Sequence, residues 1–424
     1  MISIPALYSC FLAHRRIGTD TRNIAEDSLF FALKGGNFNG NKFAGDALKK
    51  GAAYAIIDES EYYIDDRTIL VYDVLSTLQD LAKYHREQLK TIVIALTGSN
   101  GKTTTKELMH HVLSSQYETL STTGNLNNHI GVPLTLLQLE EKHTHAIIEM
   151  GANHCNEIEM LCRIAQPNFG LITNIGKAHL EGFGGEEGVA KGKTELYYYL
   201  YQTKGVVFVN RHEVKTVKYS SHNTCIYFSA TPGDDKMASL ISASPKIEFE
   251  LEGKNYISAL GGTYNFNNIL SALAVGKYFG IEAEKMGQAI ASYRPLNMRY
   301  QWVEWKSNKV LLDAYNANPD SMNAALKNFD SLHAANKIVV LGDMFELGVD
   351  AKDEHQVVVN AMADYNFEEV LVCGDFFEST TLLNGVKAFK TFDEIKEYFI
   401  SRNYDEKTIL IKGSRAMQME RLLT

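Results

Sequence analysis

The sequence predicts an α/β protein of three domains, and three observations lead to this fold class. Short apolar runs without alternation recur along the chain, with helical patterns between them, which is typical of strands covered on both faces in parallel sheets. One run leads directly into a glycine-rich loop and a helix, an order typical of phosphate-binding loops. The length of 424 residues, at about 150 residues per domain, allows two or three domains.

The first block, residues 1–88, contains short mixed elements and ends in a helical stretch over 75–89. No apolar strand in it is as clear as those that follow. We expect a small mixed α/β N-terminal domain here, with the helical stretch leading into the next domain.

The second block, residues 89–296, contains most of the turns that are rich in Gly, Asn and His. Its continuous apolar runs are 92–96, 146–150, 170–173 and 206–209. The segment 247–260 differs, because apolar and polar residues alternate on both sides of Glu252-Gly253. This pattern predicts an antiparallel hairpin. We expect a central α/β domain of the mononucleotide-binding type.

The strongest motif of the chain follows the run 92–96 and opens a helix with one apolar face. Its two glycines let backbone amides turn toward phosphate oxygens, and the helix N-terminus adds the positive end of its dipole. Lys102 is placed to reach the β- and γ-phosphates, and the Thr103 hydroxyl is placed to ligate Mg²⁺. The predicted nucleotide-binding residues are Thr97, Gly98, Ser99, Asn100, Gly101, Lys102, Thr103 and Thr104.

Two further polar positions lie at strand ends of the same block. Glu149 closes the run 146–150, and a carboxylate beside a phosphate loop suits Mg²⁺; a helix-capping or salt-bridged glutamate is the alternative. The next strand end, 173–185, is dense in glycine and polar residues and contains His179. This density favours a ligand loop over a plain turn.

The third block, residues 297–424, alternates strand and helix four times, with Pro295 in the preceding linker. Its apolar runs are 310–312, 338–341, 370–372 and 409–411. We expect a Rossmann-like, doubly wound C-terminal domain. Polar loops follow three of its strands, at 313–322, 341–348 and 411–415. Since such loops gather at the carboxyl edge of a parallel sheet, we expect a cleft between the second and third domains that closes over substrate.

Charge and composition exclude several classes of protein. The net charge of −9 disfavours binding to nucleic acid or anionic membranes by general electrostatics. Only 7 prolines occur and no low-complexity tract is present, which excludes long disordered arms. The 5 cysteines are scattered without a CxxC pair, so neither a disulfide framework nor a zinc ribbon is indicated.

The N-terminus lacks the charged and apolar regions of a secretory signal, and no apolar run approaches the roughly 20 residues that span a bilayer. We therefore expect a cytoplasmic protein without membrane insertion.

Taken in order, these motifs resemble those of the Mur ligase family over essentially the whole chain. The matching segments are 97–103, 149–151, 173–179, 193–196, Asn265 with Asn268, Arg299 and 313–316. Mur ligases are cytoplasmic, ATP-dependent, amide-forming enzymes of peptidoglycan precursor synthesis. Within the family, segments 123–134, 149–154, 316–322 and 341–348 point to members that join D-alanyl-D-alanine to a UDP-N-acetylmuramoyl tripeptide.

The resemblance implies the reaction and its cofactors. ATP phosphorylates the terminal carboxylate of the tripeptide, the amine of D-alanyl-D-alanine attacks the acyl phosphate, and phosphate leaves. ATP and Mg²⁺ are the implied cofactors, and the enzyme is expected to be monomeric without a nucleic-acid partner. The first domain would bind the UDP-sugar peptide, the second ATP, and the third would complete the ligase site.

The resemblance also assigns roles to individual residues. Lys102, Glu149, His179 and Lys193 match the catalytic positions. Thr103, Glu149, His179 and Lys193 match the metal positions, Lys193 being the lysine that relatives carry as a carbamate. Asn268, Arg299, Asp313 and Asn316 match the nucleotide side, and Thr21, Arg22, Asn125 and Asn128 face the nucleotide-sugar peptide.

Three alternatives stay open at this point. The chain could be another Mur-type ligase, such as the tripeptide-forming one, or a folylpolyglutamate synthetase. A non-catalytic nucleotide-binding protein is the distant alternative.

Overall fold

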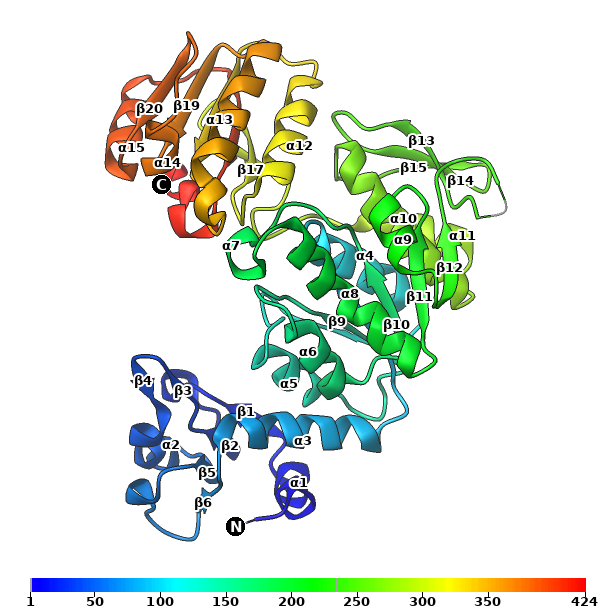
Figure 1. Ribbon diagram of the computed structural model, residues 1–424, viewed down its shortest axis with the longest axis vertical. Helices are drawn as coiled ribbons and strands as arrows, with labels where there is room; N and C mark the ends of the chain where they lie inside the picture. Colours follow the sequence, from blue (N-terminus) through cyan, green and yellow to red (C-terminus); the bar gives the residue numbers. More distant parts are fainter. Residues whose placement is uncertain (1, 234) are drawn as a thin grey trace.

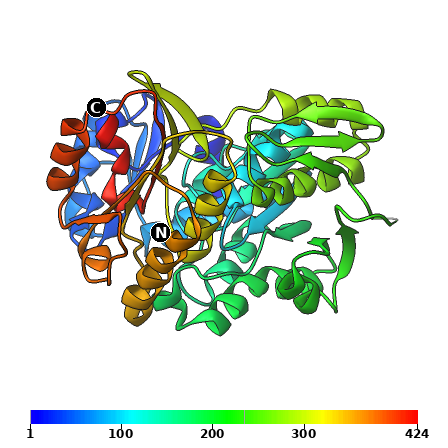
Figure 2. The same cartoon turned by 90° about the horizontal axis from the view of Figure 1, so that it is seen from above.

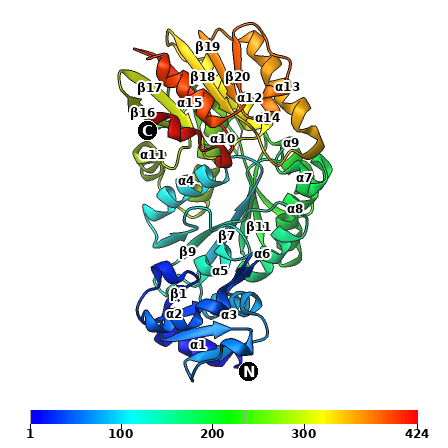
Figure 3. The ribbon, with the colours of Figure 1, turned by 90° about the vertical axis from the view of Figure 1, so that its left-hand side faces the viewer.

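The structure is a computed structural model that describes residues 2–233 and 235–424. The chain forms three tiers, each built around its own sheet (Figure 1). The side view shows the N-terminal tier at one end, the central tier in the middle and the C-terminal tier at the other end (Figure 3). Seen from above, the N-terminal and C-terminal tiers lie on the same side of the central tier (Figure 2). The predicted three-domain α/β architecture is therefore confirmed.

The N-terminal tier is a parallel four-stranded sheet in the order β1-β2-β5-β6. Its elements are α1 (Ile4–Ala13), β1 (Arg16–Gly18), η1 (Thr21–Asn23), β2 (Ser28–Phe31), β3 (Lys34–Gly35), β4 (Phe38–Asn39), η2 (Gly40–Phe43), α2 (Ala44–Lys49), β5 (Tyr54–Ile57), η3 (Ser60–Tyr62), β6 (Thr68–Leu70) and α3 (Val74–Gln88). Asp73 caps α3 by accepting a hydrogen bond from the Ser76 amide, as an N-cap aspartate does. This helix, expected over 75–89, packs on α1 of its own tier and on α5 and α6 of the central tier.

The central tier is a parallel six-stranded sheet in the order β12-β11-β10-β7-β9-β8. Its elements are β7 (Ile92–Thr97), α4 (Lys102–Ser114), β8 (Thr119–Ser121), α5 (Gly131–Leu136), β9 (His145–Glu149), α6 (Glu157–Ala165), β10 (Phe169–Ile172), α7 (Leu180–Phe183), α8 (Glu186–Gln202), β11 (Val206–Asn210), α9 (Val214–Tyr219), β12 (Thr224–Phe228), β13 (Ser239–Ser242), β14 (Glu248–Leu251), β15 (Lys254–Ile257), α10 (Thr263–Tyr278) and α11 (Ala283–Ser292). All four predicted strands are confirmed, and β14 with β15 forms the predicted hairpin.

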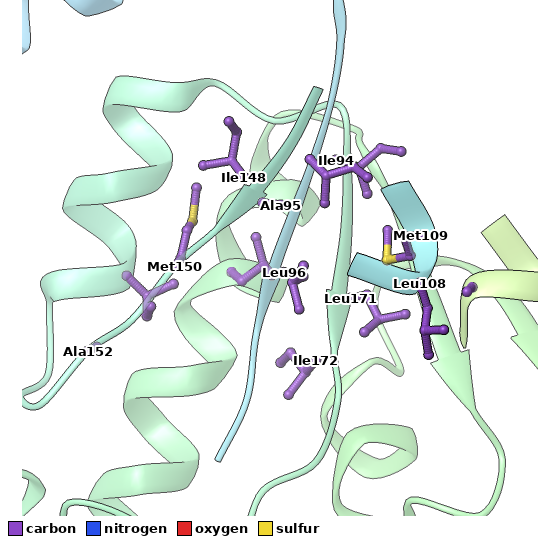
Figure 4. Packing of buried hydrophobic residues seen from close by; sticks show 14 of the residues in the cluster. Ile94, Ala95, Leu96, Leu108, Met109, Ile148, Met150, Ala152, Leu171 and Ile172 are labelled. Carbon is purple, nitrogen blue, oxygen red and sulfur yellow. The ribbon is translucent and has the colours of Figure 1, made fainter. Parts of the chain in front are cut away.

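The core of the central tier explains why its strands have continuous apolar runs. Figure 4 shows side chains of β7, β9 and β10 packed together with Leu108 and Met109 of α4. Ile94, Leu96 and Ile148 are fully buried there, because helices cover both faces of the sheet. The helix after the glycine-rich loop is thereby fixed against the strand that precedes the loop.

The C-terminal tier is a six-stranded sheet in the order β16-β17-β21-β18-β19-β20. Its elements are β16 (Gln301–Trp305), β17 (Asn308–Asp313), α12 (Pro319–Asp330), β18 (Lys337–Gly342), η4 (Gly348–Asp350), α13 (Ala351–Ala361), η5 (Met362–Asp364), β19 (Glu369–Cys373), α14 (Asp375–Glu378), β20 (Val386–Phe389), α15 (Phe392–Ser401), β21 (Thr408–Lys412), η6 (Arg415–Met417) and η7 (Met419–Leu423). The four predicted strands are present and parallel, whereas β16 is an additional antiparallel edge strand. Because β17, β21 and β18 are neighbours, the three predicted polar loops do lie at one edge.

The two connections between tiers differ in kind. A continuous helix, α3, runs from the first tier onto the second (Figure 1). The second and third tiers are joined by an irregular segment over 293–300, in which Asn297, Met298 and Tyr300 have φ values of 62°, 55° and 50°. Among residues 2–233 and 235–424, no helix is long and apolar enough to cross a bilayer.

Candidate active site

A cleft of about 720 Å³ lies where the carboxyl edge of the central sheet meets that of the C-terminal sheet. Fourteen of the predicted site residues line it. They are Ser99, Asn100, Gly101, Lys102, Thr103, Thr104, Asn125, Asn128, Glu149, His179, Asn268, Arg299, Asp313 and Asn316. The fold therefore brings together residues that are up to 217 positions apart in the chain (316 − 99).

Five predicted residues do not line this cleft. Thr97 and Gly98 lie at the base of the glycine-rich loop, and Lys193 is fully buried in α8. Thr21 and Arg22 lie in η1 of the N-terminal tier, where the exposed Arg22 side chain pairs with Asp20 at 2.6 Å. Thr21 and Arg22 therefore lie in a different tier from the other predicted site residues.

The glycine-rich loop is held in place by the loop that follows β10. The Asn100 amide donates to Asn174 Oδ1 at 2.9 Å, and Asn174 Nδ2 donates back to the Asn100 carbonyl at 3.1 Å. Gly101 has a φ of 79°, and a Cβ there would lie 2.5 Å from Asn268 Oδ1. Glycine is therefore required at 101, both for the left-handed backbone and for the close approach of α10.

Lys102 lies at the start of α4 and folds back over the loop. Its Nζ donates to the Gly98 carbonyl at 2.7 Å and to the Ser99 carbonyl at 3.2 Å. Burial lowers the pKa of Lys102, Glu149 opposes this shift, and Arg299 adds to it. No carboxylate lies within ion-pairing distance of Lys102 among the described residues. Its charge is thus available to an anionic ligand.

Thr103 and Glu149, the two predicted Mg²⁺ ligands, are in contact. The Thr103 hydroxyl donates to Glu149 Oε1 at 3.2 Å, and Asn127 Nδ2 donates to the same oxygen at 2.9 Å. The second carboxylate oxygen, Oε2, is buried without a partner. In the part of the chain that the structure describes, no three His, Cys, Asp or Glu side chains are grouped to hold a metal. This donor set fits Mg²⁺, which commonly uses one or two protein ligands together with phosphate oxygens and water.

Lys193 is buried beneath the cleft. Its Nζ donates to the Ala152 carbonyl at 3.2 Å and lies 5.1 Å from the centre of the Phe183 ring. Burial first and the nearby Lys102 second hold the pKa of Lys193 well below its usual value. A low pKa favours the neutral, nucleophilic form of the amine.

His179 lies at the N-terminus of α7, where its Nδ1 is 2.6 Å from Glu346 Oε2 of the C-terminal tier. The pair is close enough for an ion pair, although its angle is not that of a hydrogen bond. The adjacent His179 ring holds the pKa of Glu346 below its usual value against the opposing effect of burial. The pair joins the two sheets across the cleft.

On the C-terminal side, Asp313 has an ion-pair partner, whereas Arg299 lies against an aromatic ring and its Nε has no hydrogen-bond partner among the described residues. Asp313 at the end of β17 pairs with Lys412 at the end of β21, with 2.7 Å between Oδ2 and Nζ. The Arg299 guanidinium lies 3.8 Å from the centre of the Tyr315 ring, a distance typical of a cation–π contact. This edge presents one cation, one ion pair and an aromatic ring to the cleft.

Three further contacts dock the C-terminal tier onto the glycine-rich loop and the segment after β10. Asn318 Nδ2 donates to Asn100 Oδ1 at 2.8 Å. The Lys177 amide donates to Asp320 Oδ2 at 2.8 Å, and its Nζ pairs with Glu354 at 2.5 Å. The segment after β10, which holds the glycine-rich loop in place, therefore also binds the C-terminal tier.

Sequence reasoning missed several residues of this cleft as individual candidates, chiefly Asn127, Asn174, Glu346 and Lys412. All four lie in segments whose composition had drawn attention: 123–134, 173–185, 341–348 and 411–415. Their spacing in the sequence does not predict a role in the site, because each contacts a residue that is distant in the chain and that only the fold brings near. Polar residues after parallel strands were the signal that could have singled them out.

Three family models match the chain in succession. The Mur ligase family catalytic domain matches residues 14–86, the Mur ligase middle domain residues 96–276, and the Mur ligase glutamate ligase domain residues 298–415. The UDP-N-acetylmuramoyl-tripeptide–D-alanyl-D-alanine ligase of Bacillus subtilis is 33% identical, over 96% of this chain and 92% of its own. The enzyme of the same name from Haemophilus influenzae is 35% identical over the same shares.

Solved structures agree with these matches. A crystal structure of MurF from Acinetobacter baumannii superimposes with a TM-score of 0.84 at 31% identity, covering 96% of this chain and 92% of that one. The MurF ligase of Thermotoga maritima in complex with ADP superimposes with a TM-score of 0.85 at 26% identity, covering 97% of each chain.

Proposed function

This chain belongs to the Mur ligase family, and from that premise we propose that it joins D-alanyl-D-alanine to a UDP-N-acetylmuramoyl tripeptide, with conversion of ATP to ADP and phosphate. The relatives that match nearly its whole length bear the name of this activity. The single observation that carries the proposal is the cleft itself, because it joins a phosphate loop to a second α/β edge.

In the first step, an oxygen of the peptide carboxylate attacks the γ-phosphorus of ATP. The bond to the β-γ bridging oxygen breaks, ADP leaves and an acyl phosphate remains. Such a transfer needs positioning and charge neutralisation more than covalent help from the protein. The loop amides and Lys102 supply both, since the Lys102 ammonium lies on the loop without a carboxylate partner.

In the second step, the amine of D-alanyl-D-alanine attacks the acyl carbon. A tetrahedral intermediate forms, phosphate leaves with the electrons of the C–O bond, and the amine loses a proton. Cationic side chains directed at the developing negative charge lower the barrier of such a step. Lys102 from one edge and Arg299 from the other are the lining cations suited to this role.

Mg²⁺ is the metal that the site suits. Thr103 and Glu149 would hold it, and the partnerless Glu149 Oε2 supports this assignment. When bound, the ion neutralises phosphate charge and orients the phosphates. His179, which also lines the cleft, is the proposed ligand of a second ion.

We assign a carbamate to Lys193. The neutral amine adds CO2 and releases a proton, which replaces a cation with an anion beside the cleft. The burial of Lys193 and its lowered pKa support this modification. An ammonium near Mg²⁺ would be repelled by about 4 kcal/mol per unit charge of the ion at 4 Å and an effective dielectric of 20.

The three tiers take separate roles in the proposal. Residues 1–88 bind the UDP-sugar part through Thr21 and Arg22, and residues 89–296 bind ATP and, through Asn125 and Asn128, the peptide. Residues 297–424 complete the site with Asn316 and its neighbours, and we propose that they close further when both ligands bind. We also propose that the enzyme acts as a monomer in the cytoplasm.

The test is phosphate release with ATP and the UDP-linked tripeptide, with and without D-alanyl-D-alanine. We expect release to require both co-substrates, because the phosphate acceptor is the carboxylate and not water. Comparable hydrolysis without either would contradict the ligase function. A panel of amines, with lysine, diaminopimelate and glutamate beside D-alanyl-D-alanine, separates this activity from those of sister ligases.

A further inference from the structure

Resting on the proposed function, we propose that Glu346 is a positioning residue for His179. It is supplied by the C-terminal tier and holds the His179 ring so that Nε2 faces the cleft. The second cation site is then complete only while the two tiers are docked.

Hydrogen bonds within the C-terminal tier hold the loop that carries Glu346 in place. The Met344 amide donates to His355 Nε2 at 2.9 Å, and the Phe345 amide donates to Ser414 Oγ at 3.0 Å. Leu347 is buried on the other side of Glu346. From this turn, the Glu346 carboxylate reaches across to His179 of the central tier.

Both partners are held in an unusual backbone conformation. Glu346 has a φ of 65° and His179 a φ of 53°, in the left-handed region that costs a non-glycine residue about 1 kcal/mol or more. Such conformations persist where surrounding contacts impose them, and they concentrate at functional sites. Here both serve to bring one carboxylate to one ring nitrogen.

The contact leaves one ring nitrogen for a ligand. Nδ1 is buried against Glu346, while the His179 side chain lines the cleft; Nε2 is the remaining donor atom. A carboxylate beside one nitrogen of a metal-binding histidine fixes its tautomer and ring orientation and raises its basicity. Glu346 has this relation to His179.

The segment around His179 is attached to the C-terminal tier at further points. The Glu181 amide donates to the Glu346 carbonyl at 3.4 Å, and Lys177 contacts Asp320 and Glu354. Because these contacts all cross between tiers, separation of the tiers removes Glu346 from His179. Docking and completion of the cation site are therefore one event.

The experiment measures Mn²⁺ binding by electron paramagnetic resonance, with each protein saturated by a non-hydrolysable ATP analogue. We expect the wild-type protein to bind two ions. Glu346→Ala should weaken one of them about tenfold or more, the size of effect typical of a partner to a metal-bound histidine. His179→Ala should remove that ion. Glu181→Gln, which removes a carboxylate that forms no ion pair within residues 2–233 and 235–424, should change neither ion.

Glu346→Gln separates positioning from direct ligation. Its side chain has the same shape and still lies against the Nδ1 edge of the His179 ring, so it should keep most of the affinity. A loss as large as that of Glu346→Ala would mean that the carboxylate itself coordinates, and it would overturn the positioning role. Full binding of both ions by Glu346→Ala, or by His179→Ala, overturns it as well.

A parallel ligation assay on the wild-type protein keeps the two proposals apart. Absence of D-alanyl-D-alanine-dependent phosphate release refutes the proposed function, whatever the Mn²⁺ titrations give. Normal ligation together with unchanged Mn²⁺ binding in Glu346→Ala refutes only the role of Glu346.

Discussion

The two six-stranded sheets present their carboxyl edges to one cleft, but the edges are built differently. On the central edge, Lys102 and Lys193 bond only to carbonyl groups and Glu149 keeps a buried oxygen without a partner. On the C-terminal edge, Asp313 is paired with Lys412 and Asp343 accepts hydrogen bonds from the amides of Phe376 and Phe377.

The central edge therefore leaves charged groups open to ligands, whereas the acidic groups Asp313 and Asp343 of the C-terminal edge already have partners. On that edge, Arg299 Nε is a buried atom without a hydrogen bond among the described residues. A buried charged group without a counter-charge lowers stability unless a ligand satisfies it. We therefore expect changes on the central edge to affect turnover much more than stability, and changes on the C-terminal edge to affect stability strongly. The predictions below test this contrast.

The largest effect is expected for Lys102→Ala. Removing the cation that neutralises the transferred phosphate should lower kcat/KM about 1000-fold, or about 4 kcal/mol of barrier. The melting temperature should stay the same or rise, because a partly buried cation without a carboxylate partner among the described residues is lost. Phosphate release and calorimetry on the same preparation check both parts. Turnover within tenfold of wild type, or a large loss of stability, would break the contrast.

Lys412→Met should show the opposite pattern in the C-terminal tier. It leaves Asp313 without its buried partner, which costs about 3 kcal/mol of unfolding free energy. The matched control is Lys407→Met, because Lys407 pairs with the more exposed Glu368 in the same tier. Such a pair contributes about 1 kcal/mol or less. Denaturant unfolding of both variants gives the comparison, and equal losses would contradict it.

Lys193→Ala tests the anionic state proposed for the buried lysine. Loss of a ligand to the second ion should lower ligation about 100-fold, and added short carboxylates should restore part of it. Lys191→Ala, two positions earlier on α8 and exposed, should retain normal turnover. The assignment is wrong if Lys193→Ala turns over normally or if Lys191→Ala is the variant that fails.

A smaller effect is expected from pH on the C-terminal tier. Burial alone would raise the pKa of Glu369, but bonds from Lys387, Tyr398 and Tyr404 outweigh it and lower the pKa to about 2. Because the folded pKa lies below the unfolded value of 4.5, this carboxylate stabilises the fold above pH 4.5. The contribution, about 3 kcal/mol at 1.36 kcal/mol per pKa unit, is lost as the pH falls from 4.5 toward 2.

Glu369→Gln should remove most of that acid-dependent loss. Unfolding free energies at pH 7 and pH 3.5 are the measurement. A pH dependence identical to wild type would show that Glu369 contributes nothing to it.

Much of the fold was predictable because burial leaves a clear record in the sequence. The strands β7, β9, β18 and β21 are almost fully buried, so their apolar runs are continuous. The strands of the two six-stranded sheets that were not predicted, β8, β12, β16 and β20, lie at the sheet edges and are largely half-exposed. Apolar and polar residues alternate only weakly in these strands, so their local sequence does not distinguish them from loops.

The site was predictable where its chemistry is local. Residues 97–104 form one continuous loop and helix start, so their spacing alone indicates phosphate binding. Glu346 and His179 are 167 positions apart (346 − 179), and their contact depends on how two tiers dock. Residue types and order cannot predict such a contact. The low pKa of Lys193 likewise arises from burial, which its own helix does not reveal.

The helix α3 has a consequence for how the molecule opens. Leu78 and Leu81 of this helix belong to one continuous apolar cluster that includes Leu7 and Leu29 of the first tier and Ile147 of the second. Elements that share a core unfold together. The same cluster also contains Leu326 and Val339 of the third tier, so the feature particular to the first two tiers is the packing of α3 on α5 and α6. Because of this packing, amides of β2 and β7 should exchange with solvent at similar free energies. The 293–300 segment, by contrast, is where exchange and proteolysis should begin.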